Sequence, residues 1–264
     1  MKLIKPKKSL GQNFLIDQNI INKIVNIVEV KSKSILEVGP GTGNLTSHIL
    51  KKKPKKLYVI EKDDHLSLLL EKKFKKEIVI INDDILNINE NLLCEDQLIV
   101  FGNLPYNIST EILCKWILNL NDKKIWFSSL LLMFQKEVAD RIISNYNSSN
   151  YGRLSILANW KLSIEKIIDI KANCFSPVPK VDSSLLLFVP KKKFLKIKDP
   201  KNLEKITRIF FSHRRKMIKN PYKQIFSNNT DVQDKLNINL NLRPQNLDFE
   251  TYYKLANEYE KLRS

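Results

Sequence analysis

Four short apolar runs alternate with segments of helical character through the first half of the chain, and this alternation restricts the folds open to it. The runs cover residues 34–38, 57–60, 78–81 and 98–101, and each is short enough to be a buried strand. Strands that alternate with helices form a parallel sheet, because each helix crosses back over the sheet before the next strand begins. The sequence therefore predicts an α/β fold with a doubly wound sheet.

The fourth run ends in Asn103-Leu104-Pro105-Tyr106, and Ser109 can begin a helix soon afterwards. Open α/β sheets bind ligands at the carboxyl ends of their strands. The Asn103 side-chain oxygen and the Leu104 carbonyl can each accept one N–H of an exocyclic amine, which frees the lone pair of a nitrogen such as adenine N6. Pro105 fixes the turn, and Tyr106 offers a face on which a base can stack. A simple turn with a core tyrosine is the alternative.

A glycine-rich turn, GPGTG at residues 39–43, follows the first run and precedes a helical segment at 44–50. Strand, glycine turn and helix together cradle nucleotides, because glycine lets a ligand approach the backbone closely. The spacing differs from that of dinucleotide enzymes, and no Walker lysine follows, which argues against ATP hydrolysis. With the acidic Glu37 just before it, the turn suits a cationic ligand without phosphates, such as S-adenosylmethionine.

Acidic residues end the second and third runs. Glu61 lies 18 residues after Gly43, close to the roughly 20 expected for an acid that binds ribose hydroxyls. The third run ends in Asn82-Asp83-Asp84, where an aspartate could accept the amine of an adenine ring. We favour Asp84, although two adjacent aspartates leave the choice open.

Together these motifs resemble the family of S-adenosylmethionine-dependent rRNA adenine N6-dimethyltransferases. The resemblance covers most of the chain, from about residue 9 to residue 220, and Asn103 to Tyr106 is similar to the fourth motif of N6-adenine methyltransferases. Further family-like segments follow in order: GQNFL at 11–15, QKEV at 135–138 with Arg141, YGRLS at 151–155, FSPVPKVDS at 175–183 and FFSHRRKMIKN at 210–220.

The resemblance implies a Rossmann-like class I methyltransferase sheet, mostly parallel with an antiparallel edge hairpin, plus a small all-α C-terminal domain. It implies S-adenosylmethionine as methyl donor and no metal. The implied cofactor contacts are Asn13, Leu15, Gly39, Gly41, Glu61, Asp84 and Asn103. The implied catalytic residues are Asn103, Leu104, Pro105, Tyr106 and Phe175, with Tyr106 and Phe175 packing on a flipped-out base. For Phe175 alone, a core aromatic is the competing interpretation.

Within the family, the resemblance is strongest to the enzymes that act on the small ribosomal subunit. They place two methyl groups on each of two adjacent adenosines in a hairpin loop near the 3′ end of 16S rRNA. The implied reaction is an in-line attack of N6 on the sulfonium methyl group, with catalysis by positioning rather than by a general base. A cytoplasmic monomer is expected.

The composition changes after residue 190, which predicts domains at 1–190 and 191–264. Helices are expected at 201–220, 231–237 and 248–261. Cations in the first of these are expected to bind rRNA phosphates, because arginine suits bidentate phosphate contact and the chain has only seven; a solvated helix face is the alternative. These cations are Arg208, Arg214, Arg215, Lys216 and Lys219.

The net charge of +17 favours a polyanionic partner, although an excess of lysine could also reflect an A/T-rich genome. A basic arm at residues 5–9 could contact phosphates as well. The cysteines at 94, 114 and 174 and the histidines at 48, 65 and 213 lack metal-ligand spacing. We find no signal peptide and no apolar stretch of the roughly 18 residues that a membrane helix needs.

Three alternatives remain open. The first is a large-subunit rRNA methyltransferase of the macrolide-resistance type, against which the segment 210–220 argues. The second is a DNA N6-adenine methyltransferase, which would need a target-recognition insertion that the sequence lacks. The third is a non-catalytic ribosome-assembly factor, and the intact glycine turn, Glu61 and the Asn103 motif argue against it.

Overall fold

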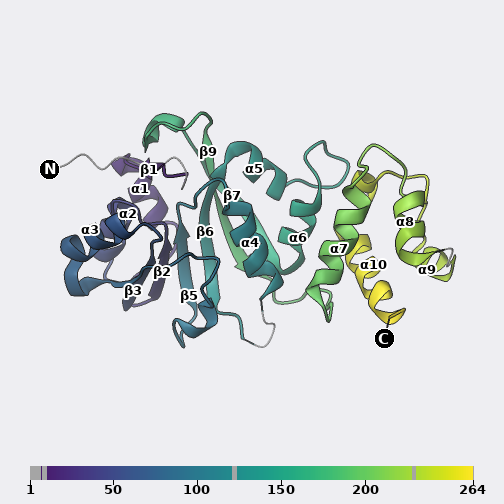
Figure 1. Ribbon diagram of the computed structural model, residues 1–264, viewed down its shortest axis with the longest axis horizontal. Helices are drawn as coiled ribbons and strands as arrows, with labels where there is room; N and C mark the ends of the chain where they lie inside the picture. Colours follow the sequence, from purple (N-terminus) through teal and green to yellow (C-terminus); the bar gives the residue numbers. More distant parts are fainter. Residues whose placement is uncertain (1–6, 8–10, 121–123, 228–229, 264) are drawn as a thin grey trace. The chain divides into compact units, whose positions relative to one another are not determined.

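The computed structural model describes residue 7 and residues 11–120, 124–227 and 230–263 (Figure 1). The basic arm expected at residues 5–9 therefore lies outside the described residues, apart from Lys7. The chain divides into two units. The first holds the chain up to Lys115 together with Leu120–Ala139 and Glu165–Pro190, and the second holds Trp116–Asn119, Asp140–Ile164 and the chain from Lys191.

A seven-stranded sheet has the order β4-β3-β2-β5-β6-β9-β7. The five strands from β4 to β6 pair in parallel, as the alternation of runs predicted, and β9 runs antiparallel to β6, as the family resemblance implied. The strands are β2 (Ser34–Val38), β3 (Lys56–Ile60), β4 (Val79–Ile81), β5 (Leu98–Gly102), β6 (Phe127–Gln135), β7 (Leu162–Ile170) and β9 (Ser183–Pro190).

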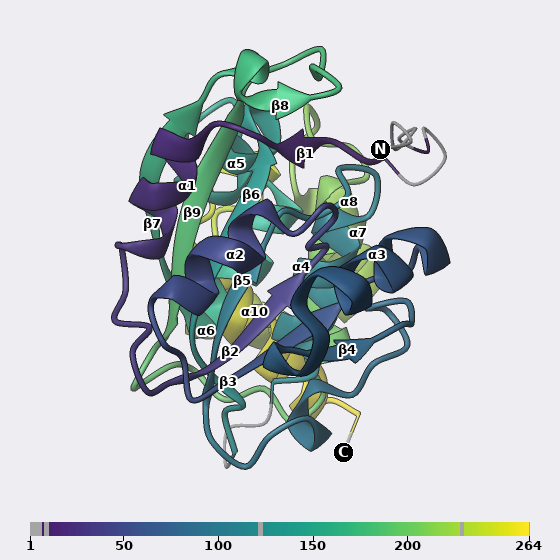
Figure 2. The same ribbon diagram turned by 90° about the vertical axis from the view of Figure 1, so that its left-hand side faces the viewer.

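Helices α1 (Gln18–Val25), α2 (Asn44–Lys51) and α3 (Asp64–Phe74) cover one face of this sheet (Figure 2). Their apolar sides form one buried cluster with strand residues that point to the same face, among them Phe101 of β5, which is fully buried. Helix α4 (Ser109–Leu118) follows β5 in the chain, as expected. Strands β2 and β5 are buried along their whole length, as is typical of strands in a sheet covered on both faces.

A second, two-stranded sheet joins the two ends of the first unit. β1 (Phe14–Leu15) pairs antiparallel with β8 (Phe175–Ser176), so that Leu15 lies opposite Phe175. The Ile16 N–H donates to the Cys174 carbonyl at 2.9 Å and continues this contact. The pairing places the family-like segment 11–15 beside the family-like segment that begins at residue 175.

The second unit is helical. Its helix α6 packs on α7 and α10, which is why residues 140–164 group with the C-terminal helices. The boundary expected after residue 190 coincides with one boundary between the units, but residues 140–164 were expected with the sheet. The helices are α5 (Lys136–Ile142), which begins in the first unit, α6 (Arg153–Lys161), α7 (Pro200–Phe211), α8 (Lys219–Phe226), α9 (Thr230–Leu236) and α10 (Phe249–Lys261).

The single helix predicted at 201–220 is wrong, because the chain forms two helices with a turn at 212–218 between them. Ser212 ends α7, and its hydroxyl donates to the Ile209 carbonyl at 2.7 Å, a local bond that competes with helix continuation. Pro221 lies in the first turn of α8, where its missing N–H costs nothing. The two later helices agree with the prediction to within one residue.

Candidate cofactor and catalytic site

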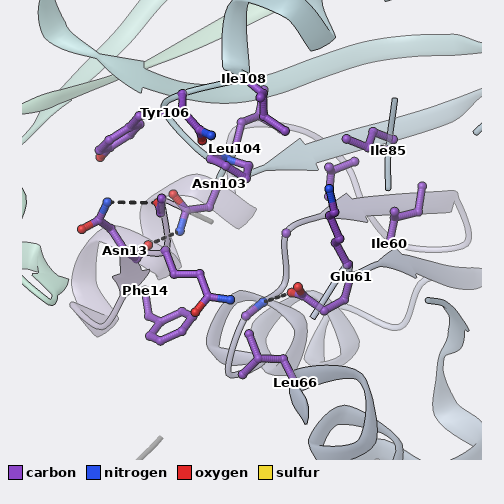
Figure 3. Close-up of a pocket in the computed structure, with 18 of the residues that line it drawn as sticks. Asn13, Phe14, Ile60, Glu61, Leu66, Ile85, Asn103, Leu104, Tyr106 and Ile108 are labelled. Carbon is purple, nitrogen blue, oxygen red and sulfur yellow. Dashed lines mark hydrogen bonds between the residues drawn. The ribbon is translucent and has the colours of Figure 1, made fainter. Parts of the chain in front are cut away.

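A pocket lies at the carboxyl ends of the parallel strands in the first unit, where the sequence placed the ligand. It encloses about 930 Å³ of empty space, including space open to solvent. Figure 3 shows Asn13, Phe14 and Tyr106 on one side and Ile60, Glu61 and Ile85 on the other. Of the implied site residues, Asn13, Gly39, Gly41, Glu61, Asp84, Asn103, Leu104, Pro105 and Tyr106 line this pocket.

The Asn103 side chain is held in one orientation. Its Nδ2 donates to the backbone carbonyl of Asn13 at 2.8 Å, and Asn13 Nδ2 in turn donates to the Gly11 carbonyl at 3.3 Å (Figure 3). Among the described residues, neither the Asn103 Oδ1 nor the Leu104 carbonyl has a hydrogen-bond donor. Two acceptors are therefore available at this corner of the pocket, as the chemistry of an exocyclic amine requires.

The glycine turn brings its backbone close to neighbouring residues. Gly39 has φ +70°, and a Cβ there would lie 3.0 Å from the Asn103 carbonyl oxygen. Gly41 has φ +57°, and a Cβ there would lie 2.6 Å from Phe14 Cδ1. A side chain at either position would strain the left-handed backbone and move a neighbour. These glycines keep the pocket wall thin where a ligand can approach.

Glu61 is buried at the pocket and holds the glycine turn in place. Its Oε2 accepts the Gly41 N–H at 3.2 Å, and its Oε1 accepts the Asp63 N–H at 3.0 Å. Burial raises the pKa of the Glu61 carboxyl, and the two N–H donors oppose that rise. A carboxylate placed this way can accept further hydrogen bonds from hydroxyl groups in the pocket.

The structure separates the two adjacent aspartates. Asp84 is half-buried and lines the pocket, whereas Asp83 is exposed and does not. Lys62 Nζ lies 2.7 Å from Asp84 Oδ2, and Leu86 N–H donates to Asp84 Oδ1 at 3.0 Å. Burial alone would raise the pKa of Asp84, but these two donors lower it below its ordinary value. Asp84 is therefore the better candidate for an acceptor of an adenine amine.

Glu37 lies beneath the glycine turn, beside a smaller cavity that Gly39 and Asn103 also border. The side chain is 1 % exposed, and Thr46 Oγ1 donates to its Oε2 at 2.7 Å. Burial raises the pKa of this carboxyl to about 8, against the Thr46 bond, which lowers it. A positive charge brought nearby would favour its ionised form.

Leu15 and Phe175 do not line the main pocket. The two residues pair in the β1–β8 sheet, and their side chains are 4 % and 1 % exposed within the hydrophobic core. Leu15 borders the smaller cavity beside Glu37. Tyr106 does line the pocket, and its hydroxyl lies 2.6 Å from Ser183 Oγ, at the end of the segment that Phe175 begins. Burial raises the pKa of Tyr106.

Several lining residues were missed from the sequence. Gln12 donates from Nε2 to Asp63 Oδ2 at 3.1 Å, and Lys7 Nζ lies 3.0 Å from the same oxygen. Phe14 and Gln12 stand in the segment 11–15, so that segment was the available signal. The apolar part of the lining comes from strand ends and from the segments after them, and it carries no polar side chain that could have indicated the site. It includes Val38, Ile60, Leu66, Ile85 and Ile108.

Four of the five cations expected to bind phosphate are exposed in the second unit, namely Arg208, Arg215, Lys216 and Lys219. Arg214 is half-buried, and it donates from Nε to Gln245 Oε1 at 3.1 Å and from a terminal nitrogen to the Ser148 carbonyl at 3.3 Å. Arg214 therefore has a structural role within this unit. Within the described ranges, no cluster of His, Cys, Asp or Glu could hold a metal, and no helix is long and apolar enough to cross a membrane.

Comparison with known proteins agrees with the family resemblance seen in the sequence. A protein from Pelagibacter ubique (strain HTCC1062) named ribosomal RNA small subunit methyltransferase A is 65 % identical over 260 residues, which cover 98 % of this chain and 99 % of the relative. A dimethyladenosine transferase from Plasmodium falciparum has a similar structure, with a TM-score of 0.79 and 26 % identity over 94 % of this chain and 98 % of that one.

The 23S rRNA methyltransferase ErmE shares the fold, with a TM-score of 0.67 and 21 % identity over 94 % of this chain and 99 % of that one. The fold alone therefore does not distinguish enzymes by their rRNA. The family model described as ribosomal RNA adenine dimethylase matches residues 4–261, nearly the whole chain. This chain, with its carboxylates and its Asn103 motif around one pocket, belongs to the ribosomal RNA adenine dimethylase family.

Proposed function

We propose that this protein dimethylates the N6 amines of two adjacent adenosines in a hairpin loop near the 3′ end of 16S rRNA, in the small ribosomal subunit. The observation that carries the proposal is the fixed Asn103 amide, which leaves Oδ1 as an acceptor beside the Leu104 carbonyl. The small subunit is preferred because the 65 % identical relative is named for it, and the match covers almost the full length of both chains. A large-subunit substrate is not favoured.

The residues around the pocket suit S-adenosylmethionine, which supplies a methyl group on a sulfonium when bound. We assign Glu61 to accept from ribose hydroxyls and Asp84 to accept from an adenine amine, because both carboxylates line the pocket. Val38, Ile60 and Ile85 give the apolar walls that a purine ring needs. Glu37 is buried close to this turn, and although burial favours its protonated form, a cationic ligand brought near it would favour the ionised form.

The protein's own contribution to catalysis is positioning. Asn103 Oδ1 and the Leu104 carbonyl accept the two N–H groups of the target amine, which turns its lone pair away from the purine ring. Tyr106 offers a face on which the extruded base stacks. Asn103 Oδ1 or water receives the proton after transfer. No buried general base is required, because the methylated nitrogen is briefly cationic and acidic.

A second methyl transfer needs room for a monomethylated amine beside Tyr106. The Tyr106 hydroxyl is hydrogen-bonded with Ser183 Oγ, and this contact fixes the position of the ring that borders the space. The exposed cations of the second unit are proposed to bind rRNA phosphates and so to orient the small ribosomal subunit on the protein. We further propose that the protein acts as a monomer in the cytoplasm, where its substrate is assembled.

The proposal is tested by incubating the protein with S-adenosylmethionine and under-methylated small subunits, then mapping the modified bases by mass spectrometry. Naked large-subunit rRNA is assayed in parallel. Dimethyladenosine at two adjacent positions near the 3′ end of 16S rRNA is the expected result. Label on the large-subunit rRNA alone would favour the macrolide-resistance type. Cofactor binding without transfer to either RNA would favour an assembly factor.

A further inference from the structure

A second cavity lies within the helical unit and is bordered by three arginines. Arg141 comes from the end of α5, Arg153 is the first residue of α6, and Arg214 follows α7. The cavity encloses about 580 Å³ of empty space, including space open to solvent, and none of its lining residues is acidic. Three of the seven arginines of the chain therefore meet at one concave site.

Two of the three arginines, Arg214 and Arg153, have no buried carboxylate to neutralise their charge. The partners of Arg214 are the Gln245 side chain and the backbone carbonyls of residues 148 and 149, all of which are neutral. Glu204 lies 3.7 Å from Arg153, but both side chains are more than 40 % exposed, so the pair is screened by solvent. The Nε atom of Arg153 is buried and has no hydrogen-bond partner within the described part of the chain.

Backbone donors add to this charge. Helix α6 has nine residues and begins after Gly152, which has no side chain to cap it. Among the described residues, the N–H groups of Arg153, Leu154 and Ser155 have no acceptor. The Ser155 hydroxyl accepts from Gly152 N–H at 3.1 Å and donates to the Arg141 carbonyl at 2.6 Å, which ties α5 to this helix start.

We infer that this cavity binds a phosphate group of the RNA backbone. Guanidinium groups and the free N–H groups of a helix start are the donors that phosphates take, and here both border one cavity. The inference rests on the proposed rRNA substrate, and it adds Arg141 and Arg153 to the phosphate-binding cations. Arg214 is followed by exposed Arg215 and Lys216, so the positive surface continues along the same turn.

The first test places a negative charge at the cavity without changing side-chain volume. Asn150 lines the cavity, is exposed and makes no side-chain hydrogen bond within the described residues, so Asn150→Asp should fold normally. The matched control is Asn241→Asp, at an exposed asparagine of the same unit outside the cavity. We expect Asn150→Asp to weaken binding to under-methylated small subunits and to naked 16S rRNA roughly fivefold to tenfold at low salt, and the control to change it less than twofold.

The second test detects the phosphate contact by measuring how RNA affinity depends on salt concentration. Arg153→Gln should reduce the slope of log affinity against log salt by about 0.7 to 0.9, the effect of losing one phosphate contact. Arg153→Lys keeps a point charge and should retain most of the slope. Arg243→Gln removes the same charge at an exposed position outside the cavity and should leave the slope unchanged.

The two proposals fail in different ways. Methyl transfer by the unsubstituted protein, combined with unchanged binding and salt slope in Asn150→Asp and Arg153→Gln, overturns the phosphate site and leaves the proposed function standing. Equal weakening by Asn150→Asp and Asn241→Asp also overturns it, since only the overall charge would then matter. Absence of transfer by the unsubstituted protein overturns the proposed function, whereas weaker binding of naked rRNA by Asn150→Asp alone still supports the site.

Discussion

Asn103 Nδ2 donates a hydrogen bond to the backbone carbonyl of Asn13 at 2.8 Å, across 90 residues of sequence. Because an amide nitrogen must be the donor to a carbonyl, this contact fixes which end of the Asn103 amide is left for a substrate. The segment before β1 therefore sets the orientation of the residue that is proposed to accept from the target amine. A change in that segment should therefore act on catalysis without substituting any residue of the Asn103 motif.

Gly11→Ala tests this dependence. Gly11 has φ +61°, and a Cβ there would lie 2.9 Å from Asn107 Oδ1, so the loop that carries Asn13 must shift. We expect kcat to fall by about tenfold or more, since small displacements at a reacting centre cost this much. Asn241→Ala is the control, because Asn241 is exposed in the second unit and lines neither the main pocket nor the cavity bordered by arginines. An unchanged kcat in Gly11→Ala would show that the position of this loop does not affect catalysis.

The two adjacent aspartates offer a paired test of the cofactor site. Asp84→Ala removes the pocket acceptor and should weaken S-adenosylmethionine binding about tenfold or more. Asp83→Asn keeps the local acceptor, since Asp83 Oδ1 bonds Asp84 N–H and Asn87 Nδ2 outside the pocket. Its affinity should change less than about twofold. Isothermal titration calorimetry gives both affinities, and an equal loss in the two variants would remove Asp84 from its proposed role.

Two substitutions at Tyr106 distinguish the contribution of base stacking from that of the hydroxyl hydrogen bond. Tyr106→Phe keeps the ring and loses the 2.6 Å contact with Ser183 Oγ, so kcat/KM for the RNA should fall only a few-fold. Tyr106→Ala removes the stacking face and should lower kcat/KM roughly 10- to 100-fold, the usual worth of one stacked base. Steady-state methyl transfer measures both. If Tyr106→Phe were as impaired as Tyr106→Ala, the hydroxyl rather than the ring face would matter.

Glu37 predicts a pH dependence of stability. Its folded-state pKa is raised to about 8 by burial, from an ordinary value of 4.5. The folded protein therefore holds this proton more tightly than the unfolded chain, and the resulting stabilisation is full below about pH 4.5 and is lost as the pH rises through about 8. Glu37→Gln cannot ionise, so its melting temperature should decline less between pH 5 and about pH 8 than that of the unsubstituted protein.

Differential scanning calorimetry at constant ionic strength checks this. Glu95→Gln removes the same formal charge at an exposed position and serves as the control. Parallel pH profiles for Glu37→Gln and the unsubstituted protein would contradict the burial argument.

The sheet and the pocket could be predicted from sequence because both depend on local patterns. Strand ends carry the polar residues, so Glu61, Asp84 and Asn103 could be identified one run at a time, and the parallel order brings them to one edge. The features that were missed depend on contacts far apart in sequence. Nothing local indicates that Leu15 pairs with Phe175 and that both side chains are enclosed.

The helical unit was less predictable for the same reason. The turn at 212–218 lies within a continuous run of basic and apolar residues, and the Ser212 bond that ends α7 has no strong sequence signal. Residues 140–164 join this unit because α6 packs on α7 and α10, which the break in composition at residue 190 does not indicate. The cavity bordered by Arg141, Arg153 and Arg214 is a product of that packing.

The most direct test of this account is Asn103→Ala, assayed for cofactor affinity and for methyl transfer with the same preparation. The account predicts that kcat falls about 100-fold or more, as when a transition-state hydrogen bond is removed, while the Kd for S-adenosylmethionine rises less than about tenfold. Calorimetry gives the Kd, and single-turnover transfer to under-methylated small subunits gives the rate. Equal losses in both, or turnover that survives the substitution, would contradict the claim that Asn103 presents the target amine.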